Sequence, residues 1–172
     1  LGSLLQLGAL ARVALRQRHV DNFAGERAPE PERWPSLAVV IPACNEVDTL
    51  GSALQTLLEL DYPNLQIVVI DDRSTDGTGA VLDAAAARDE RLVAIHNDHL
   101  PDGWLGNVHA LQLGVEATDS DWILFSDADV HMAPDVLRRT VAYALQHELD
   151  HLPVCPDLAS ESLWANVCIA AF

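Results

Sequence analysis

Three short segments of this sequence combine the residue types that bind a divalent cation and a phosphate group. They are Pro42-Ala43-Cys44-Asn45-Glu46, Asp71-Asp72-Arg73-Ser74 and Ser126-Asp127-Ala128-Asp129. Gathered carboxylates repel one another unless a cation lies between them, and the oxygens of an Asp-x-Asp pair such as Asp127 and Asp129 suit Mg²⁺ or Mn²⁺. Such a cation can bridge to a diphosphate and stabilise the charge on a departing phosphate group. Taken singly, each segment is equally explained by helix capping or turn formation.

Each of these segments directly follows an apolar run that predicts a buried strand. The three runs are residues 37–41, 66–70 and 122–125, and residues 92–95 form a further strand. Apolar residues at helical spacing predict helices near residues 50–58, 81–85, 108–117 and 134–145. In the last helix, Pro134 is the expected first residue, and the inner stripe is formed by Leu137, Val141, Ala144 and Leu145.

Strands that alternate with helices predict an α/β fold. We expect a mostly parallel, Rossmann-like sheet with right-handed crossovers and with helices on both faces. Ligands of such sheets bind beyond the carboxyl ends of the strands, which is where the three acidic segments lie. The sequence therefore predicts that they meet at one edge of the sheet.

The composition excludes several classes of function. A net charge of -16 at pH 7 and a pI near 4.5 make the surface repel phosphate backbones, so no nucleic-acid partner is expected. The chain has no lysine, which argues against P-loop enzymes and against lysine-dependent phosphatases and receiver domains. The 3 cysteines lack a CxxC pair, so neither a disulfide framework nor a structural zinc site is indicated.

Residues 39–46, 71–78 and 127–129 together resemble the family 2 glycosyltransferases of the GT-A (nucleotide-diphospho-sugar transferase) fold. The resemblance covers residues 37–149 and implies a nucleotide-diphosphate sugar as donor, with Mg²⁺ or Mn²⁺. It places Asp72 at the base, Asp129 on the metal, and Asp127 between the ribose and the water shell of the metal. The implied donor-binding residues are Pro42, Ala43, Asn45, Glu46, Asp72, Arg73, Asp127, Ala128 and Asp129.

A finer resemblance is to the hopanoid-associated glycosyltransferases, which are membrane proteins related to the ceramide glucosyltransferases. It is carried by residues 101–107 with Ala110, and by residues 161–164 before 169–172. The resemblance implies inverting transfer of a hexose from UDP, with GDP left open, to a lipid or polyprenol-like acceptor. It also implies a membrane-associated protein whose catalytic domain lies on the cytoplasmic side. Asn107 stands where these relatives usually have a lysine, so Arg73 or a residue beyond Phe172 is expected to supply the positive charge.

The resemblance and the composition together divide the chain into four parts. Residues 1–18 are expected to be a remnant of a membrane helix or an amphipathic segment. Residues 19–36, which contain three prolines, are expected to form a linker. Residues 37–151 form the nucleotide-sugar-binding domain, and residues 152–172 begin a truncated acceptor-binding or membrane-associated region. We expect the general base beyond Phe172.

Two other interpretations remain open. The chain contains His147-Glu148-Leu149-Asp150-His151, which matches the HExxH pattern of zinc metalloproteases and requires both histidines one turn apart on a helix. Asp150 within the pattern and Pro153 after it favour an exposed helix end instead. The second alternative is a chain that binds a nucleotide without turnover, because no residue after Asp129 is a clear general base.

Overall fold

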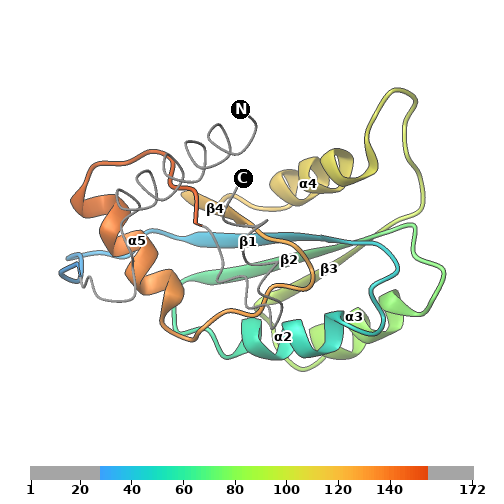
Figure 1. Cartoon of the computed structure of the whole chain (residues 1–172), viewed down its shortest axis with the longest axis horizontal. Coiled ribbons are helices and arrows are strands. Elements are labelled where there is room, and N and C mark those ends of the chain that lie inside the picture. The colour runs from blue at the N-terminus through green and yellow to red at the C-terminus, as the bar shows by residue number, and fades with distance from the viewer. Residues whose placement is uncertain (1–27, 155–172) are drawn as a thin grey trace, which may run out of the picture.

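The computed structural model describes residues 28–154, which form a four-stranded sheet flanked by helices (Figure 1). In chain order the elements are β1 (Leu37–Ala43), α2 (Leu50–Leu58), β2 (Leu65–Asp72), α3 (Thr78–Ala86), β3 (Leu92–Asn97), α4 (Gly106–Glu116), β4 (Trp122–Phe125) and α5 (Val136–Gln146). All strand pairs are parallel, and the strands lie in the order β3-β2-β1-β4. The predicted α/β fold is confirmed, as is each predicted strand and helix.

The central strands β1 and β2 are buried on both faces, as their continuous apolar runs predict. Both extend further than predicted, because the parallel register continues to pair Ala43 with Asp71 and Asp72 with Asn97. The two aspartates therefore belong to a strand and not to the loop after it. Their positions are fixed by the backbone hydrogen bonds of the sheet.

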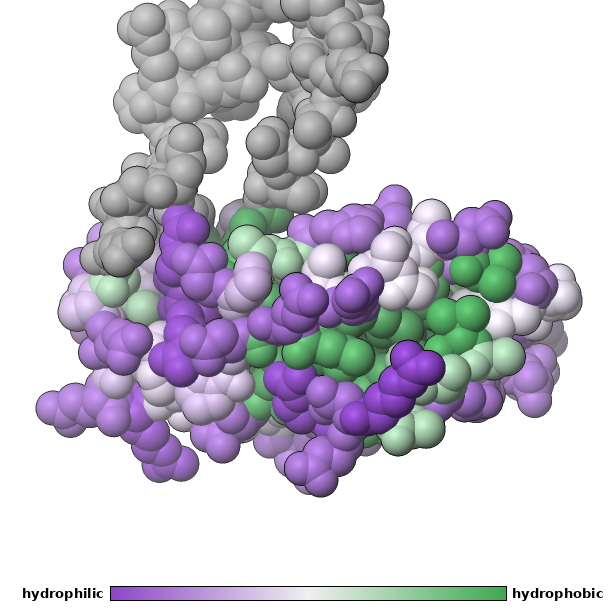
Figure 2. Space-filling model, turned by 90° about the horizontal axis from the view of Figure 1, so that it is seen from below, coloured by the Kyte–Doolittle hydropathy of each residue, from purple (hydrophilic) through white to green (hydrophobic). Residues whose placement is uncertain are grey.

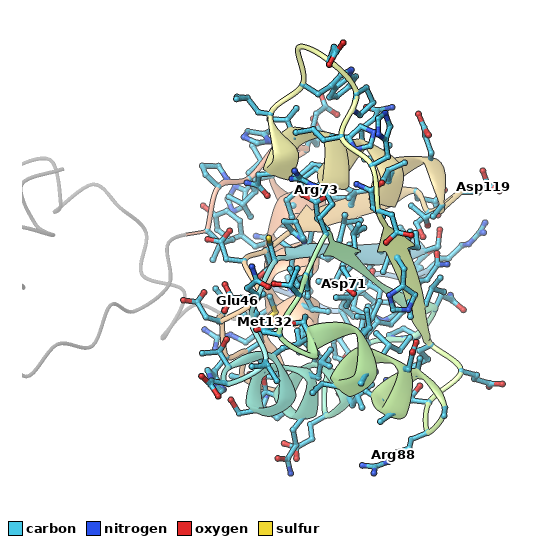
Figure 3. The ribbon with its side chains drawn as sticks, turned by 90° about the vertical axis from the view of Figure 1, so that its right-hand side faces the viewer. Glu46, Asp71, Arg73, Arg88, Asp119 and Met132 are labelled. Carbon is cyan, nitrogen blue, oxygen red and sulfur yellow. The ribbon has the colours of Figure 1, made fainter. Side chains whose placement is uncertain are left out.

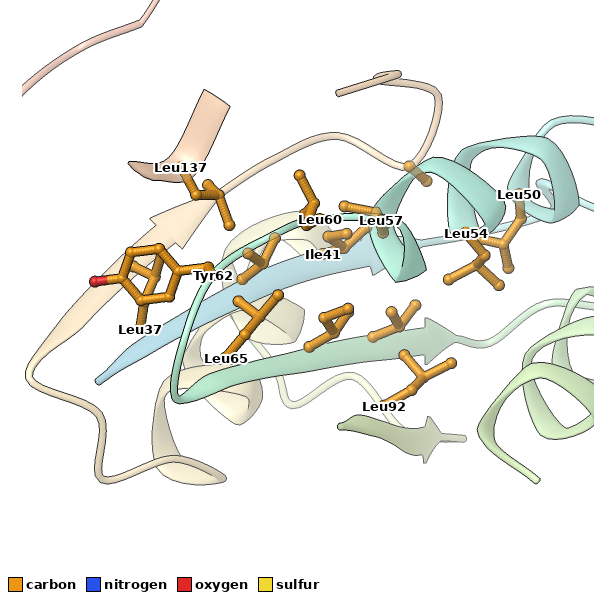
Figure 4. Packing of buried hydrophobic residues seen from close by; sticks show 14 of the residues in the cluster. Leu37, Ile41, Leu50, Leu54, Leu57, Leu60, Tyr62, Leu65, Leu92 and Leu137 are labelled. Carbon is orange, nitrogen blue, oxygen red and sulfur yellow. The ribbon is translucent and has the colours of Figure 1, made fainter. Parts of the chain in front are cut away.

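One face of the sheet packs against α2, α3 and α5. Leu50, Leu54 and Leu57 of α2 project onto it near Ile41 (Figure 4), and Leu82 of α3 joins the same cluster. This side of the molecule, viewed in Figure 2, has apolar residues in its middle and hydrophilic residues around them. The apolar stripes of these helices thus account for the larger of the two cores.

The other face of the sheet is covered by α4 alone among the described helices (Figure 1). Ala110 of α4 packs against a second, smaller core formed by β1 and β2. A Cβ atom added to Gly114 would lie 2.3 Å from Val40 Cγ1 and 2.9 Å from Ile70 Cδ1. The absence of a side chain at Gly114 therefore allows the close approach of α4 to the sheet.

Helix α5 differs from the prediction at both ends. Asp135 is its N-cap residue, so Pro134 precedes the helix instead of opening it, and the Pro134 carbonyl accepts a hydrogen bond from Asp61 N (2.9 Å). Leu145, which was predicted on the inner stripe, is 37% exposed, whereas Ala142 is 4% exposed. The buried face of α5 is thus rotated toward Ala142.

The described part of the predicted linker, residues 28–36, has no helix or strand but packs on the domain. The Trp34 ring lies 5.4 Å from the Tyr62 ring and 5.2 Å from the Arg138 guanidinium carbon. The rest of the linker, the predicted N-terminal membrane segment and residues 155–172 lie outside the described residues. Across residues 28–154, the structure contains no helix that is long and apolar enough to cross a membrane.

Candidate functional site

The order of the strands creates a crevice between the carboxyl ends of β1 and β4. The chain leaves β1 toward α2 on one face and reaches β4 from α4 on the other, and open parallel sheets bind ligands at such a switch point. Figure 3 views this edge of the sheet, with Glu46, Asp71 and Arg73 labelled near its middle. A cavity of about 390 Å³ lies here, lined by Pro42, Ala43, Cys44, Glu46, Asp72, Asn107, Asp127, Ala128 and Asp129.

The three predicted segments therefore meet at one cavity. Two of the predicted residues, Asn45 and Arg73, do not line it but hold its neighbours in place. Two further residues do line it: Cys44, which lies in the first segment but was not among the predicted donor-binding residues, and Asn107.

The loop after β1 is tied to the loop after β2 by Asn45. Its φ of 58° is left-handed, a conformation that Asn adopts more readily than most residues. Asn45 N donates to Ser74 Oγ (3.0 Å), and Asn45 Oδ1 accepts a hydrogen bond from Thr75 N (2.8 Å). Glu46 N donates to Thr78 Oγ1 (2.8 Å) at the start of α3. These bonds fix the rim of the cavity beside Glu46.

Asp72 is the most enclosed carboxylate of the cavity, with an exposed fraction of 4%. Arg73 donates to it from two nitrogens, Nε to Oδ1 (3.0 Å) and Nη2 to Oδ2 (2.7 Å), and Asn97 Nδ2 donates to Oδ1 (2.7 Å). The hydrogen bonds from Arg73 are the main reason that the pKa of Asp72 lies below its ordinary value, against the opposing effect of burial. Asp72 is therefore ionised at neutral pH.

Arg73 is held in this geometry by its own backbone and by α4. Its φ is 58°, and its N–H donates to the Asn97 carbonyl (2.8 Å) at the end of β3. A Cβ atom on Gly106 would lie 2.5 Å from Arg73 Nη2, so glycine at the start of α4 leaves room for the guanidinium. The Arg73–Asp72 pair is thus built from three separate elements.

Asp127 and Asp129 flank a buried residue in the loop after β4. Ala128 is 6% exposed and belongs to the larger core, whereas both aspartates are exposed at the cavity. Within residues 28–154 neither carboxylate forms an ion pair, and no three His, Cys, Asp or Glu side chains converge on a metal position. A divalent cation at this pair would need phosphate or water oxygens to complete its coordination.

A second cluster of titratable groups lies on the other side of β2, beside α3. His96 Nδ1 is 3.1 Å from Asp71 Oδ2, and His96 Nε2 is 2.9 Å from Asp83 Oδ1. The hydrogen bond to Asp83, followed by that to Asp71, raises the pKa of His96. Neighbouring residues of a strand face opposite sides, so Asp71 points away from the cavity that Asp72 lines.

Asn97 was missed by the sequence analysis although it contacts Asp72 directly. The signal was available, because Asn97 ends β3 and residues at strand ends are the ones that reach a ligand site. Asn107 was considered only as a replacement for lysine. Its place in the cavity follows from the packing of α4, which sequence spacing does not specify.

The HExxH pattern does not form a zinc site. Helix α5 ends at Gln146, and Glu148 has a left-handed φ of 52°, so His147 and His151 are not one helical turn apart. The His147 ring instead packs on the Tyr143 ring at a centroid distance of 4.2 Å. The match to the metalloprotease pattern is therefore coincidental.

Comparison with known proteins decides the family of this chain. The sequence profile of Glycosyl transferase family 2 matches residues 38–163. This chain belongs to glycosyltransferase family 2. A relative within the family, β-monoglucosyldiacylglycerol synthase of Synechocystis, is 30% identical in an alignment 164 residues long that covers 91% of this chain and 33% of that protein. The 4,4'-diaponeurosporenoate glycosyltransferase of Staphylococcus haemolyticus is 31% identical over 116 residues, which are 67% of this chain and 29% of that protein.

Solved structures place this family 2 chain among the GT-A glycosyltransferases. The mannosyltransferase PcManGT from Pyrobaculum calidifontis, in complex with GDP-Man and Mn²⁺, has a TM-score of 0.66 and 25% identity, and the match covers 83% of this chain and 41% of that one. Staphylococcus aureus TarS in complex with UDP-GlcNAc has a TM-score of 0.58 at 19% identity, covering 73% and 38%, and shares the fold. The chain spans about a third of the length of the curated relatives it matches.

Proposed function

We propose that this protein transfers a hexose from a nucleotide-diphosphate sugar to a lipid-like acceptor, with a divalent cation and with inversion at the anomeric carbon. We take UDP as the carrier of the sugar. Membership of glycosyltransferase family 2 supports the sugar transfer. The donor, the metal and the acceptor are argued separately below.

The negative charge of the cavity is the main observation in favour of a metal-bound donor. Among residues 28–154, the lining of the cavity includes Glu46, Asp72, Asp127 and Asp129 but no lysine or arginine. Carboxylates repel the two phosphates of a nucleotide diphosphate, and the repulsion weakens only when a cation lies between the anions. Arg73 is already paired with Asp72. The cavity therefore suits a metal-bound diphosphate and not a free anion.

Asp127 and Asp129 would hold the cation, with Asp129 as the direct ligand and Asp127 toward the ribose. Two exposed carboxylates without ion pairs inside residues 28–154 offer the hard oxygen ligands that Mg²⁺ and Mn²⁺ prefer. A cation held there would stabilise the negative charge on the leaving nucleoside diphosphate. The complex of PcManGT with GDP-Man and Mn²⁺ supports a metal of this kind.

Asp72 is the proposed acceptor of a hydrogen bond from the base of the nucleotide. Its carboxylate is ionised, rigidly held and part of the cavity lining. Pro42, Ala43 and Glu46 form the neighbouring wall, and Asn107 at the start of α4 lies where a nucleotide could contact its side-chain amide. The nucleoside would thus lie across the ends of β1 and β2, with its phosphates toward Asp129.

The proposed acceptor is a lipid or polyprenol-like alcohol, and the proposed location is the cytoplasmic side of a membrane. Support comes from the β-monoglucosyldiacylglycerol synthases of Synechocystis and Nostoc, whose names specify a glycolipid. The β-configuration in that name supports inversion if the donor is α-linked, as UDP-glucose is. The cavity carboxylates already have donor or metal roles in this proposal, so we place the general base elsewhere in the protein.

Product analysis tests the proposal. The protein is incubated with Mn²⁺, a UDP-hexose and vesicles that contain diacylglycerol or a polyprenol phosphate, and the glycolipid is examined by NMR. We expect a β-linked product from an α-linked donor and no product when EDTA is added. An α-linked product, or transfer to none of these acceptors, would contradict the proposal.

A further inference from the structure

We propose that Arg73 makes the donor site select uracil over guanine, because it occupies acceptor positions of Asp72 that guanine needs. The inference rests on the proposed role of Asp72 at the nucleotide base. It goes beyond that role because it assigns the choice of base to a residue outside the lining of the cavity. The relatives do not decide this choice, since PcManGT is in complex with GDP-Man and TarS with UDP-GlcNAc.

The acceptor positions of Asp72 are nearly filled. An ionised carboxylate has about four lone-pair positions, two on each oxygen. Oδ1 accepts from Arg73 Nε (3.0 Å) and from Asn97 Nδ2 (2.7 Å), which uses both of its positions. Oδ2 accepts from Arg73 Nη2 (2.7 Å). One position on Oδ2 is left, and since Asp72 lines the cavity, it is the position available to a ligand.

Uracil and guanine differ in the number of donors that they present to such a carboxylate. Uracil has one N–H, at N3, between two carbonyl oxygens. The Watson–Crick edge of guanine has adjacent donors at N1 and N2, which pair side by side with both oxygens of an unoccupied carboxylate. Asp72 can accept the single donor of uracil, but the second donor of guanine would face an oxygen that is already saturated. A buried donor without a partner weakens binding strongly.

Several contacts hold the fork of Arg73 on Asp72, although its side chain is 37% exposed. Its backbone is held by the hydrogen bond to the Asn97 carbonyl, and its guanidinium fills the space above Gly106. A two-nitrogen pairing of arginine with a carboxylate is both stronger and more directional than a single hydrogen bond. Lysine, which has no planar fork, could not occupy both oxygens in this way.

Affinity of the 172-residue chain for UDP and for GDP, each in the presence of Mn²⁺, tests the inference. We expect wild-type protein to bind UDP at least about tenfold more tightly than GDP, the size of effect expected for one unpaired buried donor. Arg73→Gly suits the positive φ of that residue and frees two acceptor positions. The ratio of the two affinities should then fall to within about threefold, chiefly through tighter binding of GDP.

A further variant acts as the control on this test. Arg88→Gly removes an exposed arginine at the end of α3, far from the cavity, and should leave the ratio unchanged (Figure 3). Equal binding of UDP and GDP by wild-type protein, or an unchanged ratio in Arg73→Gly, would overturn the inference alone. Failure of wild-type protein to bind either nucleotide would overturn the proposed function, and this inference with it.

Discussion

Gly114→Ala would place a methyl group between α4 and two fully buried side chains of the sheet. The added Cβ would lie 2.3 Å from Val40 Cγ1 and 2.9 Å from Ile70 Cδ1, and both residues are 0% exposed. Neither side chain can move into solvent, so α4 must shift away from β1 and β2. Overpacking of a core costs about 1–3 kcal/mol, whereas alanine in place of glycine stabilises a helix by at most about 1 kcal/mol. Subtracting that gain leaves a net loss of roughly 0–2 kcal/mol, and the 2.3 Å approach to the buried Val40 favours the upper end.

Gly51→Ala is the matched control for this prediction. Gly51 also lies within a helix, α2, but its added Cβ would meet only Val81 Cγ1 at 3.8 Å, which is ordinary contact. The same chemical change should therefore raise stability by up to about 1 kcal/mol at Gly51 and lower it at Gly114. Urea unfolding followed by circular dichroism measures both. A Gly114→Ala variant at least as stable as wild-type protein would refute the packing argument.

Two further predictions concern the carboxylates at the end of β2. Asp72→Asn should lower the affinity for UDP at least about tenfold, because a charge-assisted hydrogen bond contributes about 1.5–3 kcal/mol. Retained affinity for UDP with a lower unfolding temperature would show that Asp72 only supports the turn after β2. His96→Gln should lower stability more at pH 5.5 than at pH 8 in urea titrations. The pKa of His96 is raised on folding, so the stability that His96 contributes is complete below its pKa in the unfolded chain and is lost as pH rises through its pKa in the folded protein. A stability difference between His96→Gln and wild-type protein that does not depend on pH would contradict this prediction.

The fold could be predicted because every level of the sequence pointed to the same answer. Continuous apolar runs identified the central strands, and helical spacing identified α2 and α4. The errors at α5 occurred where the spacing of apolar residues does not determine the structure. Proline is common in the first turn of a helix, but it can also stand just before the N-cap, as Pro134 does. In the structure, Asp61 donates a hydrogen bond to the Pro134 carbonyl. That contact joins residues far apart in the chain, so local spacing could not predict it.

The candidate site could be predicted only in its outline. The rule that ligands bind at strand ends brought Asp72, Asp127 and Asp129 to one cavity. It could not show that Arg73 turns back onto Asp72, because that contact depends on a left-handed backbone and on the space above Gly106. The opposite faces of Asp71 and Asp72 follow from strand alternation once β2 is known to reach Asp72.

Calorimetric titration of the 172-residue chain with UDP, with Mn²⁺ and with EDTA, tests the metal-bridged donor site most directly. We expect binding with Mn²⁺ and none with EDTA. Asp129→Ala should abolish the difference between the two conditions, whereas Glu148→Ala, in the coincidental HExxH pattern, should leave it unchanged. Equal affinity for UDP with Mn²⁺ and with EDTA, or loss of the difference in Glu148→Ala but not in Asp129→Ala, would contradict the assignment of the cavity as a metal-dependent nucleotide-sugar site.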